Sequence, residues 1–288
     1  IIAVAEIGWT NLDRKDYKDF ERRINNAYVR LDEHNVNYHI PMPEQPNGSC
    51  NFVAFTDKAT LEFTTSRPIK IVEGKLYANS PIPQAEIRYT TDGSEPTAQS
   101  TVYSAPLTFT ENTTLKIASA LPSGKLSTVR TIQVEKQTLA PAKEVEKTAP
   151  GLNMQVFDGM FLNVKDLEAA KLQPRETKVI EETRALTAQT PSPESMRGVK
   201  QYASVATGYV NIPEDGVYYI SSDLEEVWID GKLLVNNGGE VKRFSRHDSS
   251  VALAKGLHEI KAVFLGHIIG GWPSNWNDGS VKLRKADT

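Results

Sequence analysis

Asp-Gly dipeptides separate short β-branched or aromatic runs along most of this chain of 288 residues. Such a dipeptide is typical of a tight hairpin turn, because glycine adopts the positive φ that the turn requires. The runs between the turns alternate apolar and polar residues, as half-buried strands do. Turns are expected at 92–93, 215–216, 230–231 and 278–279. This pattern restricts the chain to a mainly β architecture.

The strand-like runs fall into two blocks, which predicts two β-sandwich domains. The first block, 49–137, suggests a small immunoglobulin- or fibronectin-like sandwich, with strands at 52–55, 60–64, 86–90, 114–120 and 129–134. The second block, 151–288, suggests a larger sandwich with a short helix at 164–172 and strands at 202–212, 217–222, 226–230, 232–235, 258–267 and 280–285. Between the blocks, the polar stretch 138–150 is either a linker or a poorly ordered connection.

Residues 1–48 follow a different pattern. Apolar side chains recur three or four apart between Asp13 and Asn35, which predicts an amphipathic helix with a stripe of Tyr17, Phe20, Ile24, Ala27, Tyr28 and Leu31. A short strand is expected at 36–40, before a proline-rich exit. The apolar stripe of such a helix must pack against other elements, and the next residues belong to a different module. We therefore expect the partner of this helix in residues upstream of Ile1.

Composition excludes several classes of function. The net charge is -3, which gives no reason to expect nucleic acid as a partner. No apolar run approaches the roughly 18 to 20 residues that cross a bilayer, so no membrane insertion is expected. The single cysteine, Cys50, rules out an internal disulfide and is expected to be a small buried hydrophobe. The histidines show no metal-ligand spacing, so neither a metal nor another cofactor is expected.

Residues 1–48 resemble the end of the catalytic barrel in β-N-acetylhexosaminidases of glycoside hydrolase family 20. The residues that carry the resemblance are AVAEIGWT (Ala3 to Thr10) and DYKDFERRINNAYVRLDEHNVNY (Asp16 to Tyr38). In that family, a comparable segment follows the seventh strand, and a helix and a short last strand then close the barrel. The resemblance implies that 1–48 is a C-terminal remnant of a (β/α)8 barrel, and that the missing catalytic barrel is a partner of this chain.

The two sandwich blocks resemble modules of the same kind of enzyme. The fibronectin-like module that follows the barrel in bacterial chitobiases and hexosaminidases is similar to IRYTTDGSEPTAQSTVYSAPLTFTENTTLKIASALPSGKLS (Ile87 to Ser127). The protective-antigen-like sandwich is similar to GLNMQVFDG (Gly151 to Gly159) and to GYVNIPEDGVYYISSDLEEVWIDGKLLVNN (Gly208 to Asn237). Together the three resemblances cover nearly the whole chain.

The catalytic residues of the family have no counterpart in this sequence. The family cleaves terminal N-acetylhexosamines with help from an Asp-Glu pair on the fourth barrel strand, in which Asp orients the acetamido nucleophile and Glu is the acid/base. The only Asp-Glu dipeptide, Asp32-Glu33, falls near the end of the predicted helix, where neighbouring side chains diverge. We expect that pair at a solvated helix end and assign no catalytic residue. Trp9 stands after the sugar-pocket positions of the family and is expected to pack.

One loop carries the candidate carbohydrate-binding residues. Gly270 to Gly279 reads GGWPSNWNDG, and exposed tryptophans beside amide and carboxylate groups can stack on sugar rings. The candidates are Trp272, Trp276, Asn275 and Asp278. The alternative is that the two rings plug one end of the sandwich or dock on the neighbouring module.

Two further positions bear on sugar binding. Trp228, in the run EVWID, is expected in the core. Some protective-antigen-like sandwiches bind sugar through calcium held by paired aspartates after a strand. At the corresponding place here only Asp223 is acidic, and Leu224 replaces the second aspartate, so calcium-mediated binding is not expected.

These observations predict the non-catalytic C-terminal portion of a β-N-acetylhexosaminidase that removes terminal N-acetylhexosamine from glycans, with structural and glycan-binding roles. The alternative is a stand-alone carbohydrate-binding or structural module with no hydrolase parent. The resemblance implies a periplasmic, cell-surface or secreted location in a bacterium.

Overall fold

The computed structural model describes residues 2–46, 50–65, 70–72, 75–77, 84–191, 200–238, 247–269, 272–273 and 278–286. As predicted, these residues are mainly β, with three α-helices and strands in several sheets. Contacts divide the chain into two compact units. Unit 1 contains Ile1–Asn51 and Ala59–Val134, and unit 2 contains Phe52–Lys58 and Glu135–Thr288.

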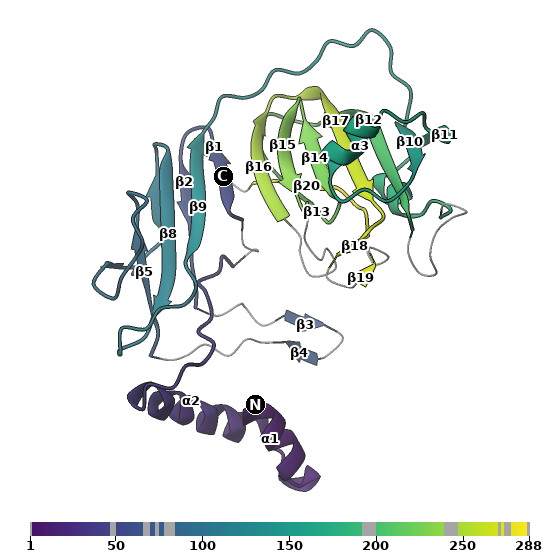
Figure 1. Ribbon diagram of the computed structural model, residues 1–288. Coiled ribbons are helices and arrows are strands. Elements are labelled where there is room, and N and C mark those ends of the chain that lie inside the picture. Colours follow the sequence, from purple (N-terminus) through teal and green to yellow (C-terminus); the bar gives the residue numbers. More distant parts are fainter. Residues whose placement is uncertain are drawn as a thin grey trace. The chain divides into compact units, whose positions relative to one another are not determined.

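Unit 1 begins with two helices, α1 (Ile2–Trp9) and α2 (Tyr17–Glu33), joined by a short 3-10 turn at Leu12–Arg14. Asp16 caps α2, because its carboxylate accepts hydrogen bonds from the backbone N–H groups of Lys18 and Asp19. The predicted amphipathic helix is therefore confirmed (Figure 1).

The expected strand at 36–40 does not form, and this prediction was wrong. A strand needs a neighbour that accepts its backbone hydrogen bonds. Instead, this segment packs by its side chains: the Tyr38 ring lies 5.1 Å from the Tyr28 ring of α2, and Ile40 is buried against Leu121. The Ser123 hydroxyl also donates to Asp32 Oδ1 at 2.5 Å. The C-terminal half of α2 is thus held against the 121–125 turn of the small sandwich.

The small sandwich of unit 1 is built from antiparallel strands (Figure 1). Strands β9, β8, β5 and β6 lie in that order, β2 pairs with β7, and β3 pairs with β4. Leu115, Ile117 and Ile132 are fully buried. The strands are β2 (Ala59–Leu61), β3 (Lys70–Val72), β4 (Lys75–Tyr77), β5 (Glu86–Thr90), β6 (Thr101–Val102), β7 (Leu107–Phe109), β8 (Thr113–Ala120) and β9 (Arg130–Lys136).

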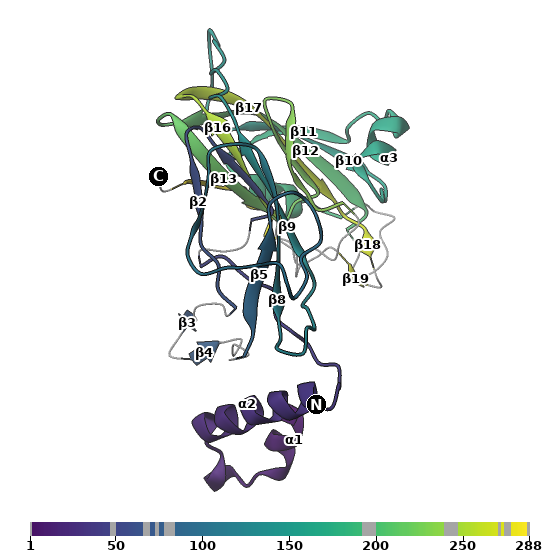
Figure 2. The same cartoon turned by 90° about the vertical axis from the view of Figure 1, so that its left-hand side faces the viewer.

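Unit 2 contains a larger sandwich of a six-stranded and a three-stranded sheet (Figures 1 and 2). The six-stranded order is β11-β10-β12-β17-β14-β15, and the three-stranded order is β16-β13-β20. Their strands are β10 (Leu152–Asp158), β11 (Glu176–Ile180), β12 (Tyr202–Ile212), β13 (Gly216–Ser222), β14 (Glu226–Ile229), β15 (Lys232–Asn236), β16 (His247–Leu253), β17 (Gly256–Leu265) and β20 (Lys282–Lys285). A short pair, β18 (Ile268–Ile269) and β19 (Trp272–Pro273), follows β17, and β1 (Phe52–Phe55) also belongs to this unit.

The core of unit 2 lies between its two sheets. Ile220 of the three-stranded sheet and Ala262 and Phe264 of the six-stranded sheet are fully buried in one cluster. The other face of the six-stranded sheet is covered in part by α3 (Val164–Ala170), the predicted short helix. Val164 and Leu167 of α3 pack there against Val263 and other side chains of the sheet.

Part of the stretch between the two sandwiches is fixed by backbone hydrogen bonds. The Ala140 N–H donates to the Ala252 carbonyl at 2.9 Å, and the Lys143 N–H donates to the Leu257 carbonyl at 2.8 Å. Residues 140–143 therefore follow β16 and β17 as an ordered connection. In the described part of the chain, no helix is both long enough and apolar enough to span a membrane.

Candidate functional site

The structure describes only part of the predicted carbohydrate-binding loop. Trp272 lies in β19, opposite Ile269 of β18. Asn275 and Trp276 lie outside the described residues. Asp278 is described, and it shows how the end of this loop is fixed.

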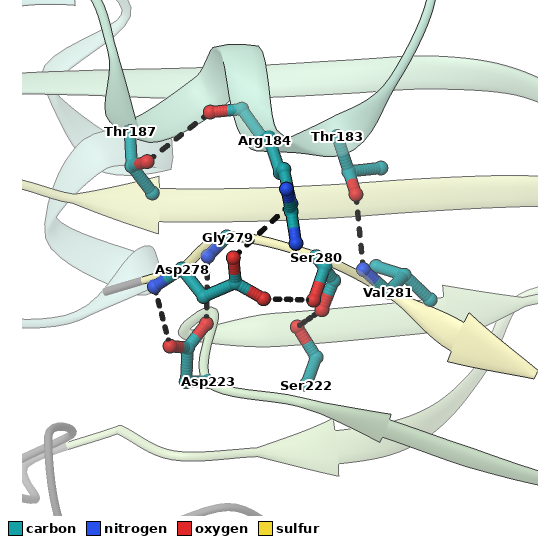
Figure 3. Close-up of polar contacts among 9 residues, drawn as sticks. All are labelled: Thr183, Arg184, Thr187, Ser222, Asp223, Asp278, Gly279, Ser280 and Val281. Carbon is teal, nitrogen blue, oxygen red and sulfur yellow. Dashed lines mark hydrogen bonds and ion pairs between the residues drawn. The ribbon is translucent and has the colours of Figure 1, made fainter.

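The backbone of Asp278 and Gly279 is held by the carboxylate of Asp223, which follows β13 (Figure 3). The Asp278 N–H donates to Asp223 Oδ2 at 2.7 Å, and the Gly279 N–H donates to Asp223 Oδ1 at 2.9 Å. Asp223 is only 8% exposed, and hydrogen bonds to a charged acceptor are stronger than neutral ones. One buried carboxylate therefore anchors the turn where the loop re-enters the sandwich.

Glycine is required at 279 for two reasons. Its φ is 72°, a left-handed conformation that side-chain-bearing residues rarely adopt. A Cβ atom there would also lie 2.7 Å from Thr187 Cγ2. Gly279 thus has the positive φ that the predicted turn requires, but residues 278–279 do not form a tight hairpin turn, because the strand that follows them, β20, pairs with β13.

The side chain of Asp278 is partly exposed and ion-paired (Figure 3). Its Oδ1 lies 3.1 Å from Arg184 Nε, and its Oδ2 accepts a hydrogen bond from the Ser280 hydroxyl. The backbone of the next residue, Ser280, is also held in place, because the Ser222 hydroxyl donates to the Ser280 carbonyl at 3.0 Å. The segments 183–187, 222–223 and 278–281 thus meet at one end of the larger sandwich.

This cluster is arranged for anchoring rather than for metal binding. Both carboxylate oxygens of Asp223 accept backbone N–H groups, and Leu224, in the place of the second aspartate, is fully buried in the core. Within the described ranges, no group of three or more His, Cys, Asp or Glu side chains could hold a metal ion. The groups here that can meet a ligand from solvent are the paired side chains of Arg184 and Asp278, which are 57% and 38% exposed.

The prediction that Trp228 lies in the core was wrong. Along β14, Val227 and Ile229 are buried in the core, whereas Glu226 and Trp228 point to the outer face of the six-stranded sheet and are half-buried. Trp228 lines an open groove of about 870 Å³ on that face. The alternation Glu-Val-Trp-Ile contained the signal, since a strand sends successive side chains to opposite faces.

The structure also shows the surroundings of four further residues, His258, Cys50, Asp32 and Trp9. His258 is fully buried, with Nδ1 2.6 Å from Asp230 Oδ2 and Nε2 2.8 Å from the Ala254 carbonyl. Cys50 is buried as predicted. Asp32 contacts Ser123, as described above, whereas the Trp9 side chain is 91% exposed. Trp9 therefore does not pack within this chain, contrary to the prediction.

Comparison with known proteins identifies the modules. Residues 72–131 match the family model "Chitobiase/beta-hexosaminidase C-terminal domain", and residues 151–287 match the PA14 domain. The chain is 46% identical over 285 residues to a beta-hexosaminidase of Porphyromonas gingivalis (strain ATCC BAA-308 / W83). This match covers 99% of the chain but 34% of that relative, so the chain spans about a third of the relative's length. The predicted resemblance to the C-terminal portion of such enzymes is confirmed.

Solved structures give only weak likenesses. A beta-glucosidase from Kluyveromyces marxianus matches 54% of the chain and 22% of its own length, at 11% identity and a TM-score of 0.38. A GH31 alpha-xylosidase from Xanthomonas citri matches 80% of the chain and 25% of its own length, at 14% identity and a TM-score of 0.34.

Proposed function

Because the chain carries a chitobiase/beta-hexosaminidase C-terminal domain followed by a PA14 domain, we propose that it is the non-catalytic C-terminal portion of a β-N-acetylhexosaminidase. The parent enzyme removes terminal N-acetylhexosamine from glycans. The single observation that carries this proposal is the 46% identity to a beta-hexosaminidase over 285 residues. The absence of the family's catalytic Asp-Glu motif from the sequence assigns the chemistry to the rest of the parent.

Exposed apolar side chains in the helical part of unit 1 support the proposal that a further domain packs against it. Trp9 and Leu12 are 91% and 85% exposed, although large apolar side chains gain free energy from burial. We propose that 1–48 closes a (β/α)8 barrel whose other elements cover these residues. The remaining domain boundaries that we propose are 49–137 for the fibronectin-like sandwich, 138–150 for the connection and 151–288 for the protective-antigen-like sandwich.

An activity assay tests this function. The chain of 288 residues and the full-length natural protein are each incubated with 4-nitrophenyl N-acetyl-β-glucosaminide. We expect release of nitrophenol by the full-length protein and none by the chain. Turnover by the purified chain, or no hydrolysis of any N-acetylhexosaminide by the full-length protein, would contradict the proposal.

A second role, glycan binding by the 270–279 loop, is favoured by the partly exposed carboxylate of Asp278 on its anchored turn. The proposed contacts are Trp272, Asn275, Trp276 and Asp278. Calorimetry with chitin oligomers tests this role in the double variant Trp272→Ala/Trp276→Ala, with Trp9→Ala as the matched control. We expect the double variant to bind the oligomers more weakly than the wild type and the control to bind as the wild type does; a double variant that binds as the wild type does would remove this role.

We propose that the parent is periplasmic, at the cell surface or secreted in a bacterium, as the resemblance to bacterial β-N-acetylhexosaminidases implies. Immunodetection in fractionated cells tests this. A signal confined to the cytoplasmic fraction would contradict the proposed location.

A further inference from the structure

The groove on the outer face of the six-stranded sheet crosses several strands. In register, Asn153 of β10 lies opposite Thr207 of β12, Thr207 opposite Lys261 of β17, and Lys261 opposite Trp228 of β14. All four side chains line the groove. Because paired residues on neighbouring strands point to the same face, these side chains form one continuous row.

Helix α3 forms a wall of this groove. Val164 and Leu167 bury the neighbouring part of the sheet face in an apolar cluster, whereas Glu168, on the same helix, lines the groove. The cap at Asn163, whose side chain accepts a hydrogen bond from the Asp166 N–H at 2.9 Å, fixes the start of the helix. The groove is thus bounded on one side and open to solvent elsewhere.

The tryptophan in the row is held in place. Trp228 Nε1 donates to Glu226 Oε2 at 2.8 Å, and Lys261 Nζ lies 5.8 Å from the centre of the indole ring, within the range of a cation–π contact. Lys261 Nζ also lies 3.1 Å from Glu168 Oε1. An aromatic ring fixed before binding costs little conformational entropy when a ligand stacks on it.

The charges of the groove disfavour an anionic ligand. Two lysines, Lys165 and Lys261, are outnumbered by three glutamates, Glu168, Glu226 and Glu259. A phosphate-rich ligand would meet this excess of carboxylates and be repelled. The groove therefore offers a ligand one aromatic surface surrounded by carboxylate, amide and hydroxyl groups. A pyranose ring fits that combination, because it has an apolar face and a rim of hydroxyl groups.

We propose that this groove binds a pyranose ring of a β-linked glycan, stacked on Trp228 with its hydroxyl groups bonded to the surrounding polar side chains. The described residues that line the groove lie outside the 270–279 loop. Only the choice of an acetamido sugar as one probe rests on the proposed function. Cellotriose, which has the same β-1,4-linked pyranose rings without acetamido groups, tests the groove independently of that function.

NMR of the indole N–H groups in the whole chain provides the test. ¹⁵N-labelled protein is titrated with chitotriose and, separately, with cellotriose up to about 10 mM, which is above a weak dissociation constant of about 1 mM. We expect at least one of the two sugars to shift the Trp228 Nε1–H signal in a saturable manner. Trp228→Phe identifies that signal by its loss.

Variants then separate recognition from folding. Trp228→Ala is expected to weaken binding at least about tenfold, and Glu226→Ala, which leaves the ring but removes its acceptor, to weaken it several-fold. Trp9→Ala, an exposed tryptophan in unit 1, should bind as the wild type does. If both sugars leave the Trp228 signal unmoved in the wild type, or shift only other indole signals, the groove proposal is overturned. Hydrolysis by the full-length protein would still support the parent function in that case.

Discussion

Replacing Asp223 by Asn tests whether a single carboxylate anchors the end of the larger sandwich. Asp223 is 8% exposed and accepts two backbone N–H groups, those of Asp278 at 2.7 Å and of Gly279 at 2.9 Å. Asn offers one acceptor oxygen and turns an N–H₂ group toward the other donor. The variant therefore loses one charge-assisted hydrogen bond, weakens the other, and leaves a buried N–H unsatisfied. We expect the free energy of unfolding to fall by about 2–4 kcal/mol.

Urea unfolding followed by tryptophan fluorescence measures this loss. Three of the four tryptophans, Trp228, Trp272 and Trp276, belong to unit 2, so fluorescence mainly reports its unfolding. Asp158→Asn is the matched control, because Asp158 is an exposed carboxylate paired with Arg175 at 2.6 Å, and surface pairs contribute below about 1 kcal/mol. If Asp223→Asn stays within about 0.5 kcal/mol of the wild type, or Asp158→Asn loses as much, the anchoring account is wrong.

Three further predictions follow from single environments. Gly279→Ala should destabilise unit 2 by about 1–3 kcal/mol in the same urea assay, since Cβ would meet Thr187 and φ is positive; an unchanged midpoint would contradict this. Burial raises the pKa of Tyr202 from 10.0 to about 12. The stability difference between wild type and Tyr202→Phe should therefore be constant below pH 10 and fall between pH 10 and 12, and a change confined to lower pH would refute it. Asp32→Ala should speed hydrogen exchange in the last turns of α2, because the hydrogen bond from Ser123 is lost, whereas unaltered exchange there would show that this bond does not hold the helix.

Periodicity predicted many of the strands with their boundaries close to those observed. β1, β5 and β12 coincide with the predicted runs, and β8, β13 and β14 differ by one residue. The Asp-Gly dipeptide at 230–231 adopts positive φ at both residues, as a two-residue hairpin turn requires. These signals are local, so the sequence alone contains them.

Two of the strands that the sequence did not predict, β11 and β16, lack such local signals. β11 (Glu176–Ile180) exposes all of its residues except Ile180 and is an edge strand, so it shows no apolar alternation. β16 begins with the polar residues His247, Asp248 and Ser249. Their strand conformation is set by pairing with β13, which is a tertiary interaction that propensity does not reveal.

Only part of the candidate site could be predicted from the sequence. Asp278 was singled out, but its anchoring by Asp223 joins residues 55 positions apart in the chain. No motif spacing connects the two. The groove around Trp228 depends on the register of four strands, although the outward direction of Trp228 itself followed from the alternation in β14. The prediction was therefore limited mainly by contacts between residues that lie far apart in the sequence, and less by the chemistry of the individual residues.

Hydrogen exchange of α1 and α2 tests the central claim most directly, namely that this chain is one portion of a larger hydrolase whose catalytic domain covers these helices. Exchange of residues 2–33 is compared between the chain of 288 residues and the full-length natural protein. We predict that the amides of α1, where Ile7 and Trp9 are exposed in this chain, gain at least about tenfold protection in the full-length protein. Equal exchange in the two proteins would contradict the claim.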